Sequence, residues 1–422
     1  MRVIPLLAVL LFLAACAAMP AEGPPPAPSP VQAQAQAQAQ AEARAPVILV
    51  SIDGFRADYL ERGVTPALSA LAQDGARAAM RPSFPSKTFP NHYTLVTGLR
   101  PDQHGIVENN MLDPAIPGVT FKLSNKAAVL DARWWDQGEP IWVTAERAGV
   151  RSAVLFWPGS EAAVRGVRPT YWLPYNEEMP NAERISRVLG WLDLPEGERP
   201  GIIALYFHHV DTAGHYYGPS SPEVEAALGE VDRALGALVE GLRARGLAAN
   251  LVVVSDHGMA ATSPDRRIYL EDLLPQDVGQ ALAMGALMTF YPAPGREVEA
   301  ERALLKPHPH MECWRRGEFP ARFQYGSNPR VAPIFCLPQT GWSITTRDWV
   351  ATGKPENGAH GYDPAHPDMT AVFVGHGPAF RKGAWAPDFD NVDIYPLLAR
   401  LLDVPAAPHA GDLDELGSVL TR

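Results

Sequence analysis

The sequence lacks a surplus of basic residues and several short signature motifs, and each absence excludes a class of protein. Its 422 residues contain 36 Lys and Arg against 47 Asp and Glu, so the formal net charge is −11. This balance argues against a nucleic-acid-binding surface, because phosphate backbones recruit basic patches. No Gly-x-Gly-x-x-Gly loop, P-loop or serine-hydrolase elbow occurs, which excludes the architectures built on them. With 46% hydrophobic residues, the chain can still bury a sizeable core.

The amino terminus also lacks an apolar segment long enough to span a membrane. The run from Val3 to Ala15 is shorter than the roughly 20 residues that a membrane-spanning helix needs, but it is typical of a signal-peptide core. Leu13-Ala14-Ala15-Cys16 resembles the bacterial lipobox, which implies cleavage before Cys16 and lipid attachment to its thiol. An ordinary signal peptide with an incidental Cys16 is the alternative.

These features predict that the chain is exported and lipidated. We expect a signal peptide over residues 1–15, then a lipidated Cys16 and a disordered Ala/Pro/Gln tether over 16–46. The predicted location is the bacterial periplasm, with a lipid anchor in a membrane, preferentially the outer one, as the only membrane contact. We expect the protein to be a monomer.

Cysteine is scarce, and export changes what the scarcity means. Apart from Cys16, only Cys313 and Cys336 are present. An oxidising compartment favours a disulfide between them, and two buried free thiols are the alternative.

The folded part alternates apolar, β-branched runs with helical patterns. The runs lack polar alternation, as expected of strands covered on both faces; they are Val47–Ile52, Ser152–Phe156, Ile202–Val210, Leu251–Ser255 and Thr370–Val374. One helix is predicted from an N-cap at Ser221 to a stop at Gly246, and another over Thr65–Ala78. This alternation predicts an α/β fold whose mostly parallel central sheet carries helices on both faces.

The domain boundaries follow from composition. We predict a catalytic domain over 47–411 and a carboxyl-terminal tail over 412–422. The segment from about 289 to 341 is rich in Pro and Arg and weakly periodic, which indicates a smaller region inserted over the core.

Acidic and imidazole side chains follow the predicted strands. In open α/β sheets, active and binding sites lie beyond the carboxyl ends of the strands. The candidate ligands in that position are Asp53, Asp211, His215, Asp256, His257 and His360. Carboxylate and imidazole without thiolate suit catalytic zinc and tolerate Mn or Mg. A helix N-cap is the alternative for any single Asp.

Six motifs, in this order, are similar to the nucleotide pyrophosphatase/phosphodiesterase family of the alkaline phosphatase superfamily. They are Ile52-Asp53-Gly54-Phe55-Arg56, Pro85-Ser86-Lys87-Thr88-Phe89-Pro90-Asn91-His92, His104-Gly105-Ile106, Asp211-Thr212-Ala213-Gly214-His215-Tyr216-Tyr217-Gly218-Pro219, Ser255-Asp256-His257-Gly258-Met259 and Gly358-Ala359-His360-Gly361. The resemblance runs from about Val47 to Pro405 and implies an alkaline-phosphatase-like core. We expect a compact, bacterial-type catalytic unit without the cysteine-rich and nuclease-like domains of vertebrate members.

The resemblance implies a two-metal site. Thr88 would be the nucleophile that forms a covalent intermediate, because metal coordination activates a weakly nucleophilic hydroxyl. One zinc would be held by Asp53, Asp256, His257 and Thr88, and the other by Asp211, His215 and His360. Asn109 would donate a hydrogen bond to a phosphate oxygen.

The resemblance also implies a substrate pocket. Phe89 and Tyr175 match positions that sandwich a nucleotide base in the family, with core packing as the alternative. Lys87 adds charge near the phosphate or is simply solvated. Trp157 lines either the pocket or the core.

These expectations predict a hydrolase of phosphodiester and pyrophosphate bonds in small nucleotides. Alternatives are a glycerophosphodiester or lysophospholipid phosphodiesterase, and a phosphate-monoester or phosphonoacetate hydrolase, which keeps the same metals and a Thr nucleophile. A sulfatase needs Cys or Ser in Cys/Ser-x-Pro-x-Arg, whereas this chain has Thr88 and His92 there. A lipid-anchored binding protein with a dead site is disfavoured, because every metal and nucleophile position is present.

Overall fold

A computed structural model describes residues 45–354 and 356–421. The predicted signal peptide, Cys16 and the tether up to residue 44 lie outside the described residues. Within those residues, no helix combines the length and apolarity needed to cross a bilayer.

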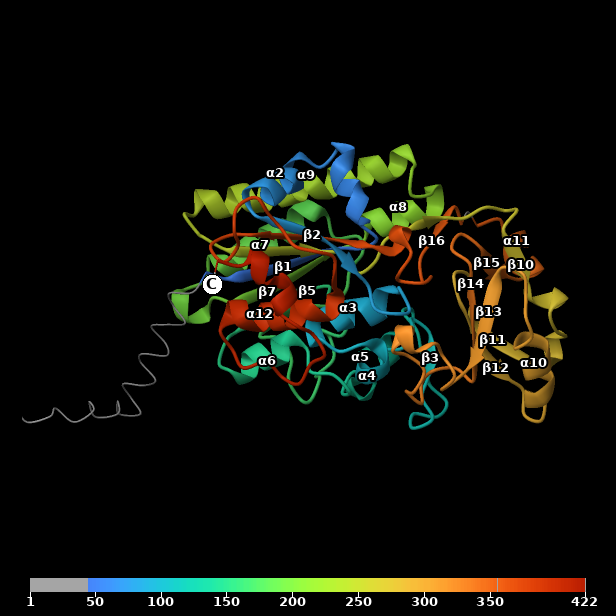
Figure 1. The fold of residues 1–422 in the computed structure, drawn as a ribbon. Coiled ribbons are helices and arrows are strands. Elements are labelled where there is room, and N and C mark those ends of the chain that lie inside the picture. The colour runs from blue at the N-terminus through green and yellow to red at the C-terminus, as the bar shows by residue number, and fades with distance from the viewer. Residues whose placement is uncertain (1–44, 355, 422) are drawn as a thin grey trace, which may run out of the picture. The chain divides into compact units, whose positions relative to one another are not determined.

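A nine-stranded sheet forms the centre of the domain (Figure 1). Its strands lie in the order β18 (Ala384–Trp385), β2 (Ala76–Arg81), β17 (Ala371–His376), β8 (Asn250–Val254), β1 (Val47–Ile52), β7 (Ile202–Phe207), β5 (Ser152–Leu155) and β6 (Tyr171–Leu173), with β19 (Phe389–Asp390) also on β2. Only β17 runs antiparallel to its neighbours β8 and β2. The mostly parallel sheet is as predicted.

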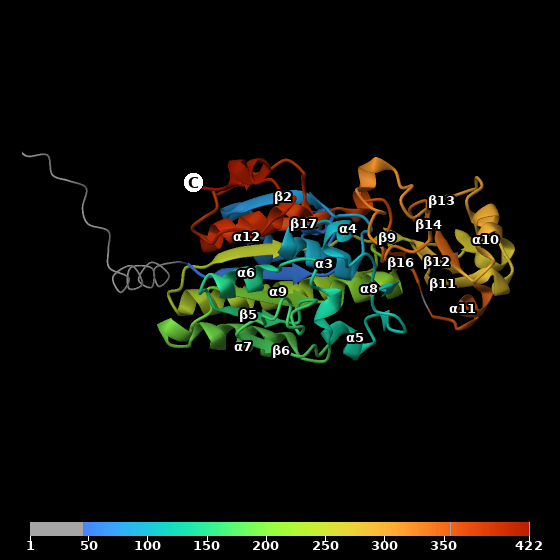
Figure 2. The ribbon, with the colours of Figure 1, turned by 90° about the horizontal axis from the view of Figure 1, so that it is seen from below.

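Helices cover both faces of this sheet because its central strand is apolar on both sides. In β1, Val47 and Leu49 face one core, whereas Ile48, Val50 and Ile52 face the other. The first core includes α3 (Thr88–Thr97), α6 (Ile141–Arg147) and α12 (Ile394–Leu402), and the second includes α2 (Pro66–Asp74), α7 (Asn181–Leu192) and α9 (Pro222–Ala244). Figure 1 shows α2 and α9 on one side of the strands and α6 and α12 on the other, and Figure 2 is seen from the side of α6 and α12.

Of the two predicted helices, one begins at the predicted residue and the other ends earlier than predicted. α9 begins where expected, since the Ser221 hydroxyl accepts a hydrogen bond from the Val224 N–H. α2 ends at Asp74, and the chain then enters β2, so the predicted helix over Thr65–Ala78 was too long. The helix ends at its C-cap Gly75, whose φ of −136° and ψ of −135° are not helical. Only glycine fits there, because a Cβ would lie 2.2 Å from the Gly375 carbonyl oxygen in β17.

A second, smaller region carries its own antiparallel sheet, with strand order β11 (Gly279–Ala283), β12 (Met288–Pro292), β14 (Ile334–Pro338) and β13 (Met311–Arg315), and the helix α10 (Glu297–Leu304). Beside it, β10 (Arg267–Tyr269) pairs with β15 (Ser343–Thr345). The region therefore extends beyond the predicted insertion at 289–341 in both directions. Cys313 and Cys336 are directly paired across β13 and β14 and form a disulfide.

The remaining elements are short or line the functional edge of the sheet. They are α4 (Pro101–His104), α5 (Lys126–Leu130), α8 (His209–Tyr217), α11 (Arg347–Ala351), β3 (Met111–Leu112), β4 (Thr120–Phe121), β9 (Ala260–Ala261) and β16 (Gly358–Ala359). The predicted tail is part of the folded domain, because Leu416 and Val419 are buried and the Arg381 N–H donates to the Val419 carbonyl.

Candidate active site

The candidate ligands meet at one edge of the sheet because they follow neighbouring strands. β8, β1 and β7 are adjacent and parallel, and Asp256, Asp53 and Asp211 come just after their carboxyl ends. Asp211 and His215 lie one turn apart on α8. His360 arrives from another direction, directly after β16.

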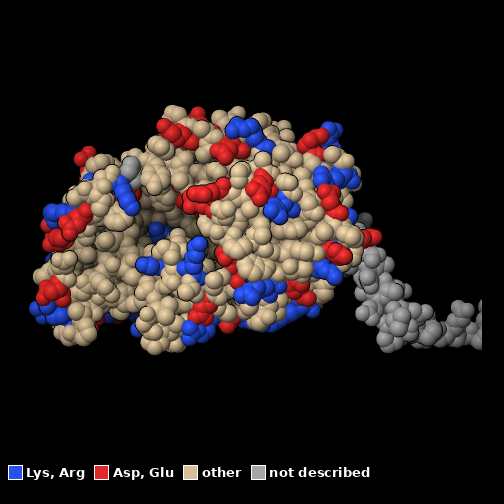
Figure 3. Space-filling model, turned by 180° about the vertical axis from the view of Figure 1, so that it is seen from behind, with Lys and Arg blue, Asp and Glu red and all other residues tan. Residues whose placement is uncertain are grey.

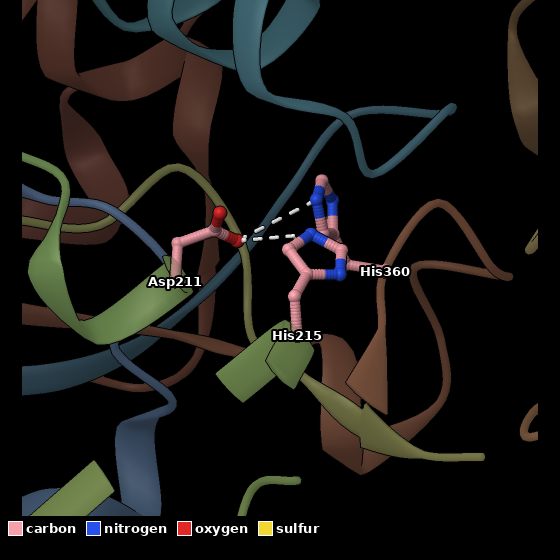
Figure 4. Close-up of side chains that lie close together, drawn as sticks. All are labelled: Asp211, His215 and His360. Atoms are coloured by element: carbon pink, nitrogen blue, oxygen red, sulfur yellow. Dashed lines mark ion pairs between the residues drawn. The ribbon is translucent and has the colours of Figure 1, made fainter. Parts of the chain in front are cut away.

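Asp211, His215 and His360 form the first cluster (Figure 4). The Asp211 Oδ1 lies 3.5 Å from the His215 Nε2 and 3.6 Å from the His360 Nε2. Each imidazole donates its Nδ1–H to a backbone carbonyl, His215 to Gly358 at 2.9 Å and His360 to Ser86 at 2.8 Å. A carbonyl can only accept, so both Nε2 atoms carry lone pairs that face the carboxylate, the arrangement of metal-binding histidines.

The second cluster consists of Asp53, Asp256, His257 and Thr88. The His257 Nε2 lies 2.9 Å from the Asp256 Oδ2, 3.5 Å from the Asp53 Oδ1 and 3.3 Å from the Thr88 Oγ1. Its Nδ1 donates to the Gly258 carbonyl at 2.9 Å. Thr88 is the first residue of α3, so its hydroxyl sits at the positive end of a helix.

Three buried carboxylate oxygens in these clusters have no hydrogen-bond partner among the described residues. They are the Asp53 Oδ1, the Asp211 Oδ1 and the Asp256 Oδ2. Imidazole nitrogens lie 2.9–3.6 Å from these oxygens, and a buried carboxylate oxygen that accepts no hydrogen bond is unfavourable unless a cation compensates it. The donor set of carboxylates and imidazoles, with no sulfur, fits divalent metal ions and zinc in particular.

The clustered charges shift the protonation of the ligands. Burial, together with the charges of Asp256 and Asp211, raises the pKa of Asp53 well above its usual value. Burial also opposes ionisation of Asp256, but the adjacent His257 and His92 outweigh it and hold the pKa of that carboxyl well below its usual range. Burial and the neighbouring cationic groups lower the pKa of His360, which favours the neutral imidazole that binds metal.

Asn109 is oriented toward the nucleophile. Its Oδ1 accepts a hydrogen bond from the Phe89 N–H at 2.9 Å. No hydrogen bond within the described residues engages its Nδ2, so this amide can donate to a ligand next to Thr88. Lys87 packs against Gly361, whose φ of +120° is strained for any residue with a side chain. The ammonium thereby stays close to His360.

The predicted pocket residues divide by exposure. Tyr175 is 42% exposed and packs edge-on against Phe156, with a centroid distance of 5.5 Å. Phe89 is half-buried against Phe121 and Trp135. Trp157 is only 1% exposed, and its Nε1 donates to the His92 carbonyl at 3.0 Å. Of the two expectations for Trp157, pocket or core, its burial favours the core, where its ring packs among the residues behind the site.

Two side chains at the site were not among the predicted functional residues. The buried Tyr206 donates its hydroxyl to the Asp53 Oδ2 at 2.7 Å. The buried His92 lies 3.2 Å from the Asp256 Oδ2 through its Nδ1.

One face of the molecule is hollowed, and both acidic and basic side chains are interspersed over it without a continuous basic patch (Figure 3).

One protein family matches this chain over most of its length. The family described as type I phosphodiesterase/nucleotide pyrophosphatase matches residues 47–363. An uncharacterised pyrophosphatase/phosphodiesterase of Schizosaccharomyces pombe is 41% identical over 389 residues, covering 86% of this chain and 78% of the relative. Ectonucleotide pyrophosphatase/phosphodiesterase family member 5 of Homo sapiens is 36% identical over 386 residues, covering 89% of this chain and 79% of the relative.

Two solved structures of the same family are similar to this chain over most of its length. The human family member 5 has a TM-score of 0.85 at 35% identity, covering 89% of this chain and all of that chain (100%). The murine family member 5, an inactive variant with a threonine replaced by alanine in complex with AMP, has a TM-score of 0.85 at 34% identity, covering 90% of this chain and 100% of that chain. The relatives named here are eukaryotic. The chain therefore belongs to the nucleotide pyrophosphatase/phosphodiesterase family, enzymes of the alkaline phosphatase superfamily with its α/β fold.

Proposed function

We propose that this protein hydrolyses phosphodiester and pyrophosphate bonds of nucleotides through a covalent intermediate on Thr88, with two zinc ions as cofactors. The observation that carries the proposal is the position of the Thr88 hydroxyl. It lies at the start of α3, 3.3 Å from the His257 Nε2, beside three buried carboxylate oxygens that lack hydrogen-bond partners. The murine relative supports the role of a threonine, since its threonine-to-alanine variant is inactive.

Two groups of residues would each bind one metal ion, and Asn109 would bind the phosphate. Asp53, Asp256, His257 and Thr88 would hold one ion, and Asp211, His215 and His360 the other. When bound, two such cations lower the pKa of the hydroxyl and neutralise charge on phosphate oxygens. Asn109 donates its free N–H to a non-bridging oxygen.

The reaction then proceeds by two displacements. In the first, the Thr88 hydroxyl gives its proton to solvent as its oxygen bonds to phosphorus, the bond to the leaving group breaks, and the leaving oxygen takes up a proton from solvent. In the second, a water oxygen bonds to phosphorus, the bond to Thr88 breaks and the threonine regains its hydroxyl proton. The helix N-terminus favours negative charge on the nucleophile and phosphate throughout.

Nucleotides are the substrate class we infer, because Phe89 follows the nucleophile in the chain and the Tyr175 ring lies 6.3 Å from that of Tyr206, whose hydroxyl bonds to Asp53. Phe89 and the exposed Tyr175 present ring surfaces on which a base can stack, and the murine relative was solved with AMP. A glycerophosphodiesterase, a lysophospholipid phosphodiesterase or a monoester hydrolase would use the same Thr88 and ligands with a different pocket.

A paired assay on the purified protein tests the proposal. The thymidine 5′-monophosphate p-nitrophenyl ester and p-nitrophenyl phosphate are compared by kcat/KM, with and without chelator, in the wild-type protein and in Thr88→Ala. We expect the diester to be preferred by roughly two orders of magnitude or more, and its turnover to be lost with chelator and in the variant. Preference for the monoester would refute the phosphodiesterase assignment and replace it with a phosphatase.

We further propose that the protein is a monomeric, bacterial-type member delivered to the periplasm and anchored by a lipid on Cys16, in the outer membrane. The Leu13-Ala14-Ala15-Cys16 motif supports this, as does the Cys313–Cys336 disulfide, which suits an oxidising compartment. Replacing Cys16 with Ser should move the protein from the membrane fraction to the soluble fraction; unchanged fractionation would refute the anchor.

A further inference from the structure

His92 lies between the nucleophile and a metal ligand. It follows Thr88 by one turn of α3. Its Nδ1 is 2.9 Å from the Thr88 carbonyl oxygen and 3.2 Å from the Asp256 Oδ2, and its Nε2 is 2.8 Å from the Ser51 Oγ. The imidazole thus connects the backbone of the nucleophile, the carboxylate of a ligand and the central strand β1.

These contacts define which nitrogen carries the proton. The Thr88 carbonyl can only accept a hydrogen bond, so the His92 Nδ1 is the donor. The Nε2 is engaged in turn by the Ser51 hydroxyl at 2.8 Å. Asp53, His92 and Asp256 lie close enough together to share an ion, but neither ring nitrogen has a lone pair free for it. His92 is therefore not a metal ligand.

The ring is also locked in place and shielded. His92 is fully buried. Trp157 packs edge-on against it at a centroid distance of 5.1 Å, and Tyr206 does so from another side at 5.2 Å. The Trp157 Nε1 donates to the His92 carbonyl. Substrate cannot reach the imidazole, so any influence on the reaction passes through the groups that it touches.

We propose that His92 is a positioning residue that ties the start of α3 to the Asp256 carboxylate and so sets the distance between the Thr88 hydroxyl and the ion held by Asp256. The inference rests on the proposed function, because it concerns a metal ligand and the nucleophile of that reaction. Partners of this kind orient ligands and tune the affinity for the ion. Losing His92 should weaken metal binding and lower kcat, with little change in KM.

The test compares variants that keep or lose one nitrogen. His92→Asn retains an N–H where Nδ1 was, whereas His92→Gln places its amide near the former Nε2. Ser51→Ala removes the hydroxyl that orients the ring. His104→Asn is the matched control, since His104 is equally buried but bonds to the Thr94 hydroxyl and the Ile106 N–H.

Two quantities are measured on the full chain: the affinity for Zn²⁺ alone, by competition with a chelator, and the kcat and KM for the diester. We expect His92→Gln to lower zinc affinity and kcat roughly 10- to 100-fold, with KM nearly unchanged. His92→Asn should restore part of both losses, and His104→Asn should retain zinc affinity and kcat even if its unfolding midpoint falls.

A folded His92→Gln variant with wild-type zinc affinity and kcat would overturn the inference, as would a His92→Asn variant no better than His92→Gln. If His92→Gln does not fold, Ser51→Ala decides, and unchanged zinc affinity and kcat there would overturn it. Failure of the wild-type protein to bind zinc would instead refute the proposed function, so the two failures are distinguishable.

Discussion

Replacing Asp53 with Asn should change stability in opposite directions with and without metal. Asp53 is almost fully buried, its Oδ1 has no hydrogen-bond partner, and burial with the charges of Asp256 and Asp211 raises its pKa. In the metal-free protein the ionised carboxylate is therefore destabilising. An Asn side chain has the same shape, and its oxygen still accepts the Tyr206 hydroxyl.

The size of each effect follows from the environment of Asp53. Removing one uncompensated buried charge should stabilise the metal-free protein by about 1–3 kcal/mol. With zinc at about 100 times the wild-type Kd, ligand binding adds about 2.7 kcal/mol to the wild type, and most of this is lost when a ligand is removed. The variant should be more stable in chelator, less stable in zinc, and inactive.

The stability difference between Asp53→Asn and the wild type in chelator should increase with pH. A carboxyl whose pKa is raised on folding adds stability below its unfolded-state pKa, and that contribution is lost as pH rises through the folded-state pKa. The advantage of Asp53→Asn in chelator should therefore be largest at mildly alkaline pH and disappear on acidification, once the wild-type carboxyl is protonated.

Urea unfolding in chelator and in zinc measures these differences. Asp232→Asn is the matched control: Asp232 is also buried, but its oxygens accept from the Ala67 and Leu68 N–H groups at 3.0 and 2.8 Å. It should destabilise the protein in both conditions, because one N–H loses its acceptor. If Asp53→Asn destabilises the metal-free protein as Asp232→Asn does, the reasoning is refuted.

Three further changes separate the other roles. Asn109→Ala should lower kcat/KM for the diester roughly 10²- to 10³-fold without loss of bound zinc, and a drop confined to KM would contradict this. Tyr175→Ala should weaken binding of a thymidine diester by about 1–3 kcal/mol but spare a diester without a base; equal losses in the two KM values would exclude stacking. Cys313→Ser should lower the free energy of unfolding by about 3 kcal/mol, from the loop closed across a sequence separation of 23. Because β13 and β14 lie in the second sheet, kcat/KM should stay close to the wild-type value, and a large loss would place that sheet in the reaction.

The sequence predicts the central sheet well because its signal is local. Strands such as Val47–Ile52 are apolar at every position, and burial on both faces imposes that pattern. The end of α2 was not predictable in this way. The chain leaves the helix at Gly75 and passes there so close to Gly375, far away in the sequence, that a Cβ would clash with its carbonyl oxygen.

The ligands at the metal clusters could be anticipated because each follows a strand or a helix turn at a recognisable spacing. Their supporting residues could not. Tyr206 sits inside an apolar strand, where nothing local distinguishes its hydroxyl contact to Asp53 from ordinary packing. Trp157 stands in a loop motif that suits a pocket wall or a core equally, and only the packed structure shows it behind His92.

The stereochemical outcome at phosphorus tests the central claim most directly. Hydrolysis of a nucleotide phosphorothioate diester of one configuration in ¹⁸O-labelled water reports how many displacements occur. Attack by Thr88 followed by attack by water inverts phosphorus twice, so the account predicts net retention of configuration. Net inversion would mean that water attacks the substrate directly, and it would contradict a covalent intermediate on Thr88.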